Sequence, residues 1–220
     1  MGKYRNIQSI INPSGLVVGI LGRDGSGKST FIEQIVPSLE PYFNGIDKFK
    51  KFPSLFYKEA IFKKKGPYDN SKPHHYGQRG RFASFLKLNL IFVEFMLGYW
   101  LKVFPIKAKS HLILYDRYFI DVLADPLRYR IKGNRLFIKA FHHILPKPDL
   151  WIILDLPSDV LVQRKQELTY EMAEKLRYPY LNLQKLLQNT IVINNEQELY
   201  KTVNEASTFI LNYMHKKIKG

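Results

Sequence analysis

Short apolar runs alternate along the chain with longer segments in which apolar residues recur every three or four positions. The short runs, rich in leucine, isoleucine and valine, predict buried strands at residues 16–21, 111–116, 150–155 and 190–194. The helical spacing predicts helices at residues 28–39, 82–103, 134–144, 158–167, 170–188 and 196–217. A further strand fits residues 42–52, and the segment 117–133 has a mixed pattern.

This order of elements predicts the fold class. Strands that alternate with helices are typical of an α/β fold, in which a mostly parallel sheet, here of about five strands, carries helices on both faces. A length of 220 residues suits one domain with a sizeable core. No repeat or low-complexity linker divides the chain, so we expect a single domain over residues 1–220.

The segment Gly22–Thr30, GRDGSGKST, has the G-x-x-x-x-G-K-[ST] pattern of a phosphate-binding loop. It lies between a predicted strand and a predicted helix, which is the context that such a loop requires. Its glycines let backbone N–H groups point toward phosphates, and the helix N-terminus adds partial positive charge. The motif predicts a bound nucleoside triphosphate, with candidate binding residues Gly22, Asp24, Gly25, Ser26, Gly27, Lys28, Ser29 and Thr30.

Asp116, Arg117 and Tyr118 close the predicted strand at residues 111–116. A carboxylate there can lie beside the phosphate-binding loop and hold Mg²⁺ through water, or act on an acceptor hydroxyl. Arg117 can bind an anionic acceptor bidentately. The alternative is an ion pair that caps the strand end. Asp116 and the Ser29 hydroxyl are the candidate metal-binding groups.

Three motifs, in order along the chain, resemble the thymidylate kinase family of nucleoside monophosphate kinases. They are the phosphate-binding loop, the Asp-Arg-Tyr sequence, and PDLWIILDLP at residues 148–157 followed by Glu171, Arg177, Tyr180 and Leu181 on the next helix. The resemblance extends from Val17 to about Leu187. It implies a three-layer P-loop kinase fold, with ATP and Mg²⁺ as cofactors.

The resemblance also implies roles for individual residues. Lys28 would contact the ATP phosphates, and Asp24 would contact the acceptor. Asp116 would serve the metal or the acceptor. Arg117 would hold the phosphate of the acceptor, with Tyr118 beside it.

A short lid is expected at about residues 164–171. Arg164 and Lys165 begin it and would neutralise negative charge on the transferring phosphoryl group. An exposed helix end is the alternative interpretation of these two residues. Gly25 stands where some members of the family carry a catalytic arginine, which leaves this task to the lid.

The acceptor-side insertion, about residues 42–105, departs from the family pattern. Its long helix lacks the Arg-Ala-x-His-like segment that binds the nucleotide in thymidylate kinases. The chain resembles instead a divergent thymidylate-kinase-like branch, many of whose members occur among surface-polysaccharide genes. A sugar or glycan hydroxyl is therefore an alternative acceptor to a nucleoside monophosphate.

Further candidate acceptor-binding residues lie in two segments. Asp121 and Asp125 are four residues apart and would share one face of a helix, where they can bind acceptor hydroxyls or pair with nearby arginines. His74 and Arg79 belong to a basic segment that precedes the predicted long helix in the sequence. The histidine pair at residues 142–143 is expected to be structural.

The chain carries a formal net charge of +15. Residues 47–81 contribute ten lysines or arginines against three acidic residues. Such a segment suits an anionic substrate or an acidic membrane surface, and a solvated face is the alternative. No nucleic-acid-binding signature accompanies the charge, so nucleic acid is not an expected partner.

The helix predicted around residues 82–104 is apolar on nearly every side, although Lys87, Glu94 and Lys102 interrupt it. A largely buried helix fits this pattern, and so does a helix that also touches a membrane or a partner. The chain has no cysteine and no apolar run suited to a signal peptide at its start. We expect a cytoplasmic protein, with peripheral contact at the inner membrane face and a homodimer both left open.

The sequence leads to one main hypothesis and two alternatives. The main hypothesis is ATP- and Mg²⁺-dependent phosphoryl transfer to a small anionic acceptor, with thymidine monophosphate as the leading candidate. A kinase for a sugar or glycan, linked to surface polysaccharide synthesis, is the first alternative. The second is a P-loop NTPase that acts as a switch docked to a membrane or a partner.

Overall fold

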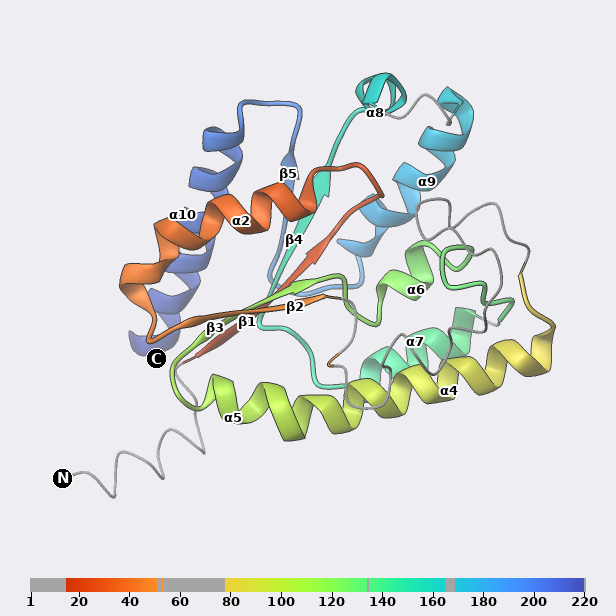
Figure 1. Ribbon diagram of the computed structural model, residues 1–220, viewed down its shortest axis with the longest axis horizontal. Coiled ribbons are helices and arrows are strands. Elements are labelled where there is room, and N and C mark those ends of the chain that lie inside the picture. Colours follow the sequence, from red (N-terminus) through yellow and green to blue (C-terminus); the bar gives the residue numbers. More distant parts are fainter. Residues whose placement is uncertain (1–14, 51–52, 54–77, 134, 165–168, 220) are drawn as a thin grey trace, which may run out of the picture.

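The computed structural model describes residues 15–50, 53, 78–133, 135–164 and 169–219. At its centre lies a five-stranded sheet in which all paired strands are parallel, in the order β2-β3-β1-β4-β5 (Figure 1). The α/β fold with about five parallel strands is thereby confirmed. The strands are β1 (Leu16–Leu21), β2 (Ile46–Lys50), β3 (Leu112–Asp116), β4 (Leu150–Asp155) and β5 (Thr190–Asn194).

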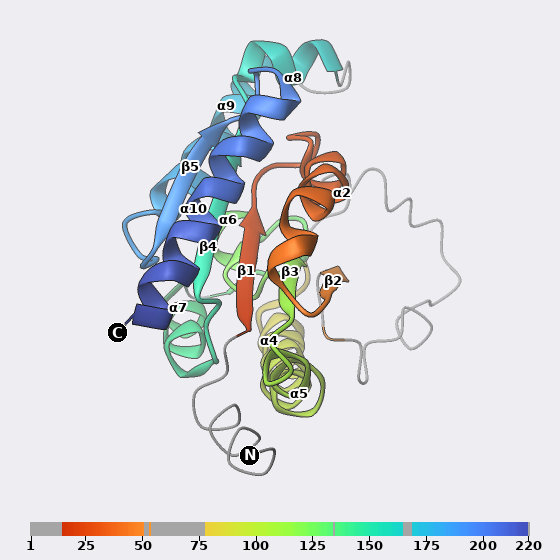
Figure 2. The same ribbon diagram turned by 90° about the vertical axis from the view of Figure 1, so that its left-hand side faces the viewer.

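Helices cover both faces of the sheet and make three layers (Figure 2). α2 and α10 pack on one face, and α4, α6, α7 and α9 pack on the other. A short 3₁₀ turn, η1 (Glu40–Tyr42), follows α2. The helices are α2 (Lys28–Leu39), α4 (Arg81–Gly98), α5 (Phe104–Lys107), α6 (Asp121–Ala124), α7 (Arg135–Ile144), α8 (Ser158–Arg164), α9 (Tyr170–Leu183) and α10 (Leu199–Lys219).

β1 shows why the central strands are continuously apolar. Its side chains alternate between the two buried clusters, with Val17 and Leu21 on the α4 side and Leu16, Val18 and Ile20 on the α2 side. A strand covered by helices on both faces therefore has no position that favours a polar residue.

One glycine in this strand makes room for a neighbouring aromatic ring. A Cβ at Gly19 would lie 2.5 Å from a ring carbon of Trp151, which is buried on the adjacent β4. The absence of a side chain thus lets the largest residue of β4 pack across β1.

The long apolar helix differs from the single helix expected at residues 82–103. It begins at Arg81, passes through a π-helical turn, η3 (Tyr99–Val103), and continues as α5. Pro105 has no N–H to donate to the carbonyl four residues earlier, which accounts for the irregular ladder just before it. Figure 1 shows the three pieces as one rod along one side of the molecule.

Other element ends also differ from the expected ranges. α9 ends at Leu183 and α10 begins at Leu199, so both are shorter at those ends than expected. The mixed segment contains only the short α6, and Asp125 is its C-cap. Most of the basic insertion and the lid residues 165–168 lie outside the described residues.

His142, on α7, is buried against the ring of Trp151, with the ring centroids 6.2 Å apart. Its Nδ1 has no hydrogen-bond partner in the part of the chain that the structure describes. Burial, together with the smaller effects of the nearby Lys147 and His143, lowers the pKa of His142 to about 4. The imidazole is therefore a neutral part of the core, as expected for a structural histidine.

We expect this histidine to make folding stability depend on pH. The pKa of His142 is about 4 in the folded state against 6.5 for an unperturbed histidine, so the unfolded state binds the proton first as pH falls. The stabilisation is fully present above pH 6.5 and is lost progressively down to about pH 4, by about 3 kcal/mol in total. Urea unfolding of His142→Phe across this range should show a flatter dependence than wild type.

His215→Phe is the matched control, because His215 is an exposed histidine on another helix, α10. This control should keep the wild-type slope. A His142→Phe protein with an unchanged slope would show that another group causes the loss of stability at acidic pH.

Candidate functional site

The phosphate-binding loop connects β1 to α2 at the carboxyl end of the sheet. Gly22, Gly25 and Gly27 have φ values of 149°, 88° and 85°, which are conformations that side chains with a Cβ rarely adopt. Gly27 also has no space for a side chain, since a Cβ there would lie 2.5 Å from Nδ2 of Asn195. The glycines of the motif are therefore required by the path of the loop itself.

Asn195 supports this loop from the end of β5. Its Nδ2 donates to the carbonyl of Ser26 at 2.7 Å, and its backbone N–H donates to the carbonyl of Asp155 at 2.7 Å. The side chain is buried. Asn195 was not among the residues predicted from the sequence. It directly follows a predicted strand, and residues at the carboxyl ends of parallel strands often line or support a ligand site, so its position could have indicated this role.

Arg23 points away from the cavity and anchors the loop to the elements after β4. Its guanidinium donates to Ser158 Oγ at 3.0 Å, to the carbonyl of Ala173 at 2.6 Å, and to the carbonyl of Leu156. Burial lowers the pKa of Arg23, and the nearby Asp155 partly offsets that effect. Arg23, at a position where the motif allows any residue, thus joins the loop to α8 and α9.

Lys28 lies in the first turn of α2, with its ammonium group inside the loop. Its Nζ donates to the carbonyls of Gly22 at 2.9 Å and Arg23 at 2.7 Å. The side chain is buried and lines the cavity described next. Its positive charge therefore lies where the loop amides of such a motif would hold a phosphate.

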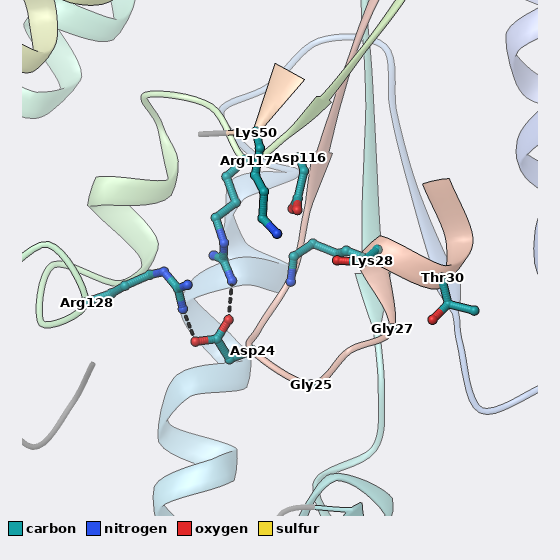
Figure 3. A pocket seen from close by; sticks show the side chains of 10 residues that line it. Asp24, Gly25, Gly27, Lys28, Thr30, Lys50, Asp116, Arg117 and Arg128 are labelled. Carbon is teal, nitrogen blue, oxygen red and sulfur yellow. Dashed lines mark hydrogen bonds and ion pairs between the residues drawn. The ribbon is translucent and has the colours of Figure 1, made fainter. Parts of the chain in front are cut away.

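A cavity of about 310 Å³ opens beside the loop, within the size range of small-molecule sites. In Figure 3 the guanidinium groups of Arg117 and Arg128 converge on Asp24, and Lys50, Lys28 and Asp116 point toward the same space. Four cationic side chains thus face two acidic ones. The lining residues are Asp24, Gly25, Gly27, Lys28, Ser29, Thr30, Lys50, Asp116, Arg117 and Arg128.

Asp116 ends β3 at the wall of this cavity. Its Oδ1 is buried and accepts no hydrogen bond from the residues that the structure describes. Mg²⁺ is commonly bound by one or two carboxylates together with substrate phosphates and water. Asp116 and the Ser29 hydroxyl, which line the same cavity, fit that donor set. No group of three or more His, Asp or Glu side chains gathers within the described ranges.

Arg117 is fixed by a buried network on one side. Its Nη1 donates to both carboxylate oxygens of Asp121, at 2.9 and 2.8 Å, and to the hydroxyl of Tyr180 at 3.0 Å. The Tyr129 and Tyr180 hydroxyls each donate to Asp121 at 2.8 Å. Arg117 is 2% exposed and Asp121 is 0% exposed. The carboxylate thus has partners for both of its oxygens.

Electrostatics keeps the members of this network in defined charge states. Burial by itself would lower the pKa of Arg117, but Asp121 and Tyr180 outweigh it and the pKa lies well above its ordinary value. Burial and the Asp121 charge raise the pKa values of Tyr129 and Tyr180 well above 10. Arg117 is cationic and both hydroxyls are protonated at neutral pH.

On its other side, Arg117 meets the phosphate-binding loop. Its Nη2 donates to Oδ1 of Asp24 at 2.7 Å, and Nη1 of Arg128 pairs with Oδ2 of the same carboxylate. Oδ1 of Asp125 accepts the backbone N–H of Arg128 at 3.1 Å. Asp24 therefore aligns two guanidinium groups at the cavity wall.

The structure brings some of the expected acceptor-binding residues together and separates others. Asp24 and Arg117 line the cavity. Tyr118 is buried in the core with its hydroxyl bonded to Pro146, Asp121 lies beneath Arg117, and Asp125 binds the backbone of Arg128. These three residues support the site from behind and are not among the residues that line it.

The remaining candidates lie elsewhere. Arg164 ends α8 with an exposed side chain and does not line the cavity. Arg79 is half-buried, and its backbone N–H bonds to the carbonyl of Arg130. Lys165 and His74 lie outside the described residues.

Two cavity-lining cations were not predicted, namely Lys50 and Arg128. Lys50 ends β2, the strand that the sequence pattern located least well. Arg128 lies on the loop after α6, where its role depends on a contact with Asp24 more than a hundred positions earlier. The position of Lys50 at the end of a strand could have predicted that it lines the site, whereas no sequence feature near Arg128 predicts this.

The buried network yields a stability prediction. Asp121→Asn should lower the free energy of unfolding by about 3–5 kcal/mol, because it leaves the Arg117 guanidinium buried without its counter-charge. Tyr129→Phe removes one neutral hydroxyl from the same carboxylate and should cost only about 1 kcal/mol. Urea denaturation of both variants measures the difference. Equal losses for the two variants would contradict the assigned ion pair.

No protein-family model and no curated protein matches this sequence. The resemblance to thymidylate kinases thus remains a prediction carried by the quoted motifs. The chemistry of this site is accordingly inferred from its own residues and their geometry.

Proposed function

We propose that this protein transfers a phosphoryl group from ATP to a small anionic acceptor. One observation carries the proposal: a single cavity has the phosphate-binding loop on one wall and three further cations, Lys50, Arg117 and Arg128, on another. A protein that only held ATP would have no need of a second cationic wall facing the loop. The Asp116 carboxylate lies on the wall of the same cavity.

In the proposed reaction, the loop and Lys28 bind the phosphates of ATP. Backbone N–H groups and the α2 N-terminus favour the negative charge, and Lys28 adds a full positive charge. Ser29 and Asp116 would hold Mg²⁺, which when bound neutralises charge on the phosphate oxygens and orients them. Catalysis then consists of positioning and electrostatic stabilisation, without a covalent intermediate on the protein.

The cationic wall supports an acceptor that carries its own phosphate. An acceptor oxygen forms a bond to the γ-phosphorus while the bond to the bridging oxygen of ADP breaks, and ADP leaves. An ionised phosphate oxygen has no proton to lose in this step, whereas a sugar hydroxyl needs a base. Asp24 already pairs with Arg117 and Arg128, so its geometry suits holding these guanidinium groups more than taking a proton.

These features favour a phosphomonoester over a neutral sugar. A nucleoside monophosphate satisfies them, and the motif resemblance makes thymidine monophosphate the first one to try. The wall of Lys50, Arg117 and Arg128 would bind the acceptor phosphate in the same cavity as the loop. The test is ADP formation from ATP across nucleoside monophosphates, sugar phosphates and acidic glycans.

Lys28→Ala should reduce ADP formation with the accepted substrate by at least about a hundredfold, because it removes a charge that faces the transferring phosphate. Circular dichroism should show that the fold is retained. Lys175→Ala, on the exposed surface of α9, is the matched control and should keep wild-type activity. Full activity of Lys28→Ala would contradict the assignment of this loop.

Arg128→Gln should raise the KM for the acceptor by at least about tenfold, since a partly buried cation that binds an anion is lost. The KM for ATP should change much less, because Arg128 lies across the cavity from Thr30. Lys132→Gln, an exposed cation four residues away that does not line the cavity, is the control. Steady-state kinetics with each substrate varied separates the two effects.

Turnover with neutral sugars alone would contradict the proposed acceptor class while leaving ATP use intact. In that case Arg128→Gln and wild type should have the same KM for the sugar. Absence of ADP formation with every acceptor class would contradict the proposed transfer itself.

A further inference from the structure

The outer side of α4 is an exposed apolar stripe. Its members recur every three or four residues, so they share one face of the helix. Each is more than a third exposed, although the opposite side of the same helix packs Leu88, Ile91 and Phe95 into the core. The stripe consists of Phe82, Leu86, Leu90, Val93 and Leu97 on α4 and of Leu101 on η3, which continues the helix.

The apolar surface continues onto α7. The rings of Phe85 on α4 and Phe137 on α7 pack edge to face, with their centroids 5.9 Å apart, and both are about half exposed. Leu136 and Ile144 of α7 are exposed as well. We call the α4 stripe together with Phe85, Leu136, Phe137 and Ile144 the α4–α7 face. Contiguous apolar surface of this kind marks an interaction site.

The charges around this face all have one sign. Within residues 79–133 and 135–148, every acidic residue, namely Glu94, Asp116, Asp121 and Asp125, is buried. The lysine and arginine side chains that are exposed in these ranges lie on or next to α4, α5 and α7, and are Arg81, Lys109, Lys132, Arg135, Lys139 and Lys147. The exposed charged side chains in these ranges are therefore all cationic.

The rod formed by α4, η3 and α5 passes a length and hydropathy test for a membrane-spanning helix, but one of its sides is buried in the protein. Its 27 residues are long enough to span a membrane and contain an 18-residue window with a mean hydropathy of 1.4. One such helix is weak evidence, since the core helix of a globular protein passes the same test. Its inner side belongs to the core and includes the buried Glu94. Only its outer side is available to lipid, which corresponds to a helix lying in a membrane surface.

We propose that the α4–α7 face docks the protein on an anionic lipid surface. The apolar stripe would enter the boundary between headgroups and acyl chains, and the flanking cations would pair with anionic headgroups. A second copy of this chain is a poorer occupant, because a two-fold contact would bring these cations toward their own copies without acidic residues between them. Charge complementarity thus favours the lipid.

The proposed docking face adjoins the loop that carries Arg128. Nζ of Lys87 on α4 donates to the carbonyl of Tyr129 at 2.6 Å, and Ser84 Oγ accepts the N–H of Lys132 at 2.9 Å. The same helix that carries the proposed docking face thus also contacts the loop that carries Arg128. The docking proposal does not depend on phosphoryl transfer, since neither the stripe nor its flanking cations line the cavity.

The test is co-sedimentation of the full chain with vesicles. Two compositions are compared: phosphatidylcholine alone, and equal amounts of phosphatidylcholine and phosphatidylglycerol. At low salt, binding to the anionic vesicles should be at least about tenfold tighter than to the neutral ones. Raising the salt to about 0.5 M should remove most of that difference, because the Debye length falls below 5 Å.

Two double variants probe the two parts of the face. Leu90→Gln with Leu97→Gln should weaken binding to anionic vesicles about tenfold through lost apolar contact. Arg135→Gln with Lys139→Gln should weaken it about tenfold through lost charge and should reduce the salt dependence. Circular dichroism and urea unfolding confirm that each variant is folded.

Matched controls lie on other helices. Met172→Gln with Tyr200→Gln replaces side chains that are 50% and 65% exposed, comparable to Leu90 at 48% and Leu97 at 39%. Lys175→Gln with Lys201→Gln removes the same net charge from α9 and α10. Both controls should bind anionic vesicles within about twofold of wild type.

Three results would overturn the proposal. The first is no sedimentation of wild type with anionic vesicles at low salt. The second is equal loss of binding in the face variants and their controls, which would indicate attraction by net charge alone. The third is sedimentation velocity showing a wild-type dimer that the Leu90 and Leu97 variant dissociates, without lipid binding, which would make the face a self-association surface.

Discussion

The buried ion pair between Arg117 and Asp121 is the interaction on which the candidate site depends. Arg117 follows β3 with a positive φ of 75°, a conformation that costs free energy in a non-glycine residue and persists only where its surroundings enforce it. A buried ion pair also needs every oxygen satisfied, and the hydroxyls of Tyr129 and Tyr180 do this for Asp121. Segments after β3, after α6 and on α9 therefore converge on one carboxylate, and the free side of the guanidinium is directed at Asp24.

Buried hydrogen bonds also hold the predicted phosphate-binding loop on the side away from the cavity. Arg23 ties it to the β4–α8 turn and to α9, and Asn195 ties it to the end of β5. Asp24 then joins the loop to Arg117 and Arg128. These contacts fix the loop and the two guanidinium groups relative to each other, so the proposed transfer would need little reorganisation of these side chains.

The sequence predicted the features that depend on neighbours along the chain. β1, β3 and β4 were located because strands buried on both faces are continuously apolar. The phosphate-binding motif was recognised by its fixed spacing, and its phosphate-binding role stays a prediction. Arg128 could not be found in this way, since only the folded chain brings it to Asp24. Asp121 was expected either to contact an acceptor or to pair with a nearby arginine, and the structure pairs it with Arg117. The choice could not be made from the sequence, because a four-residue spacing does not say which side of a helix faces the core. The π-helical turn before Pro105 likewise depends on how α4 continues into α5.

α4 meets two requirements that a core helix alone does not explain. Its inner side packs against the sheet, and Ser84 and Lys87 hold the loop of Arg128. A helix selected only for these contacts would have a polar outer side, because exposed apolar residues favour aggregation. The outer side of α4 is apolar and its exposed charged neighbours are cationic, which is the composition of a surface that contacts anionic lipid. One helix thus combines core packing and contacts to the loop of Arg128 on its inner side with an exposed apolar outer side.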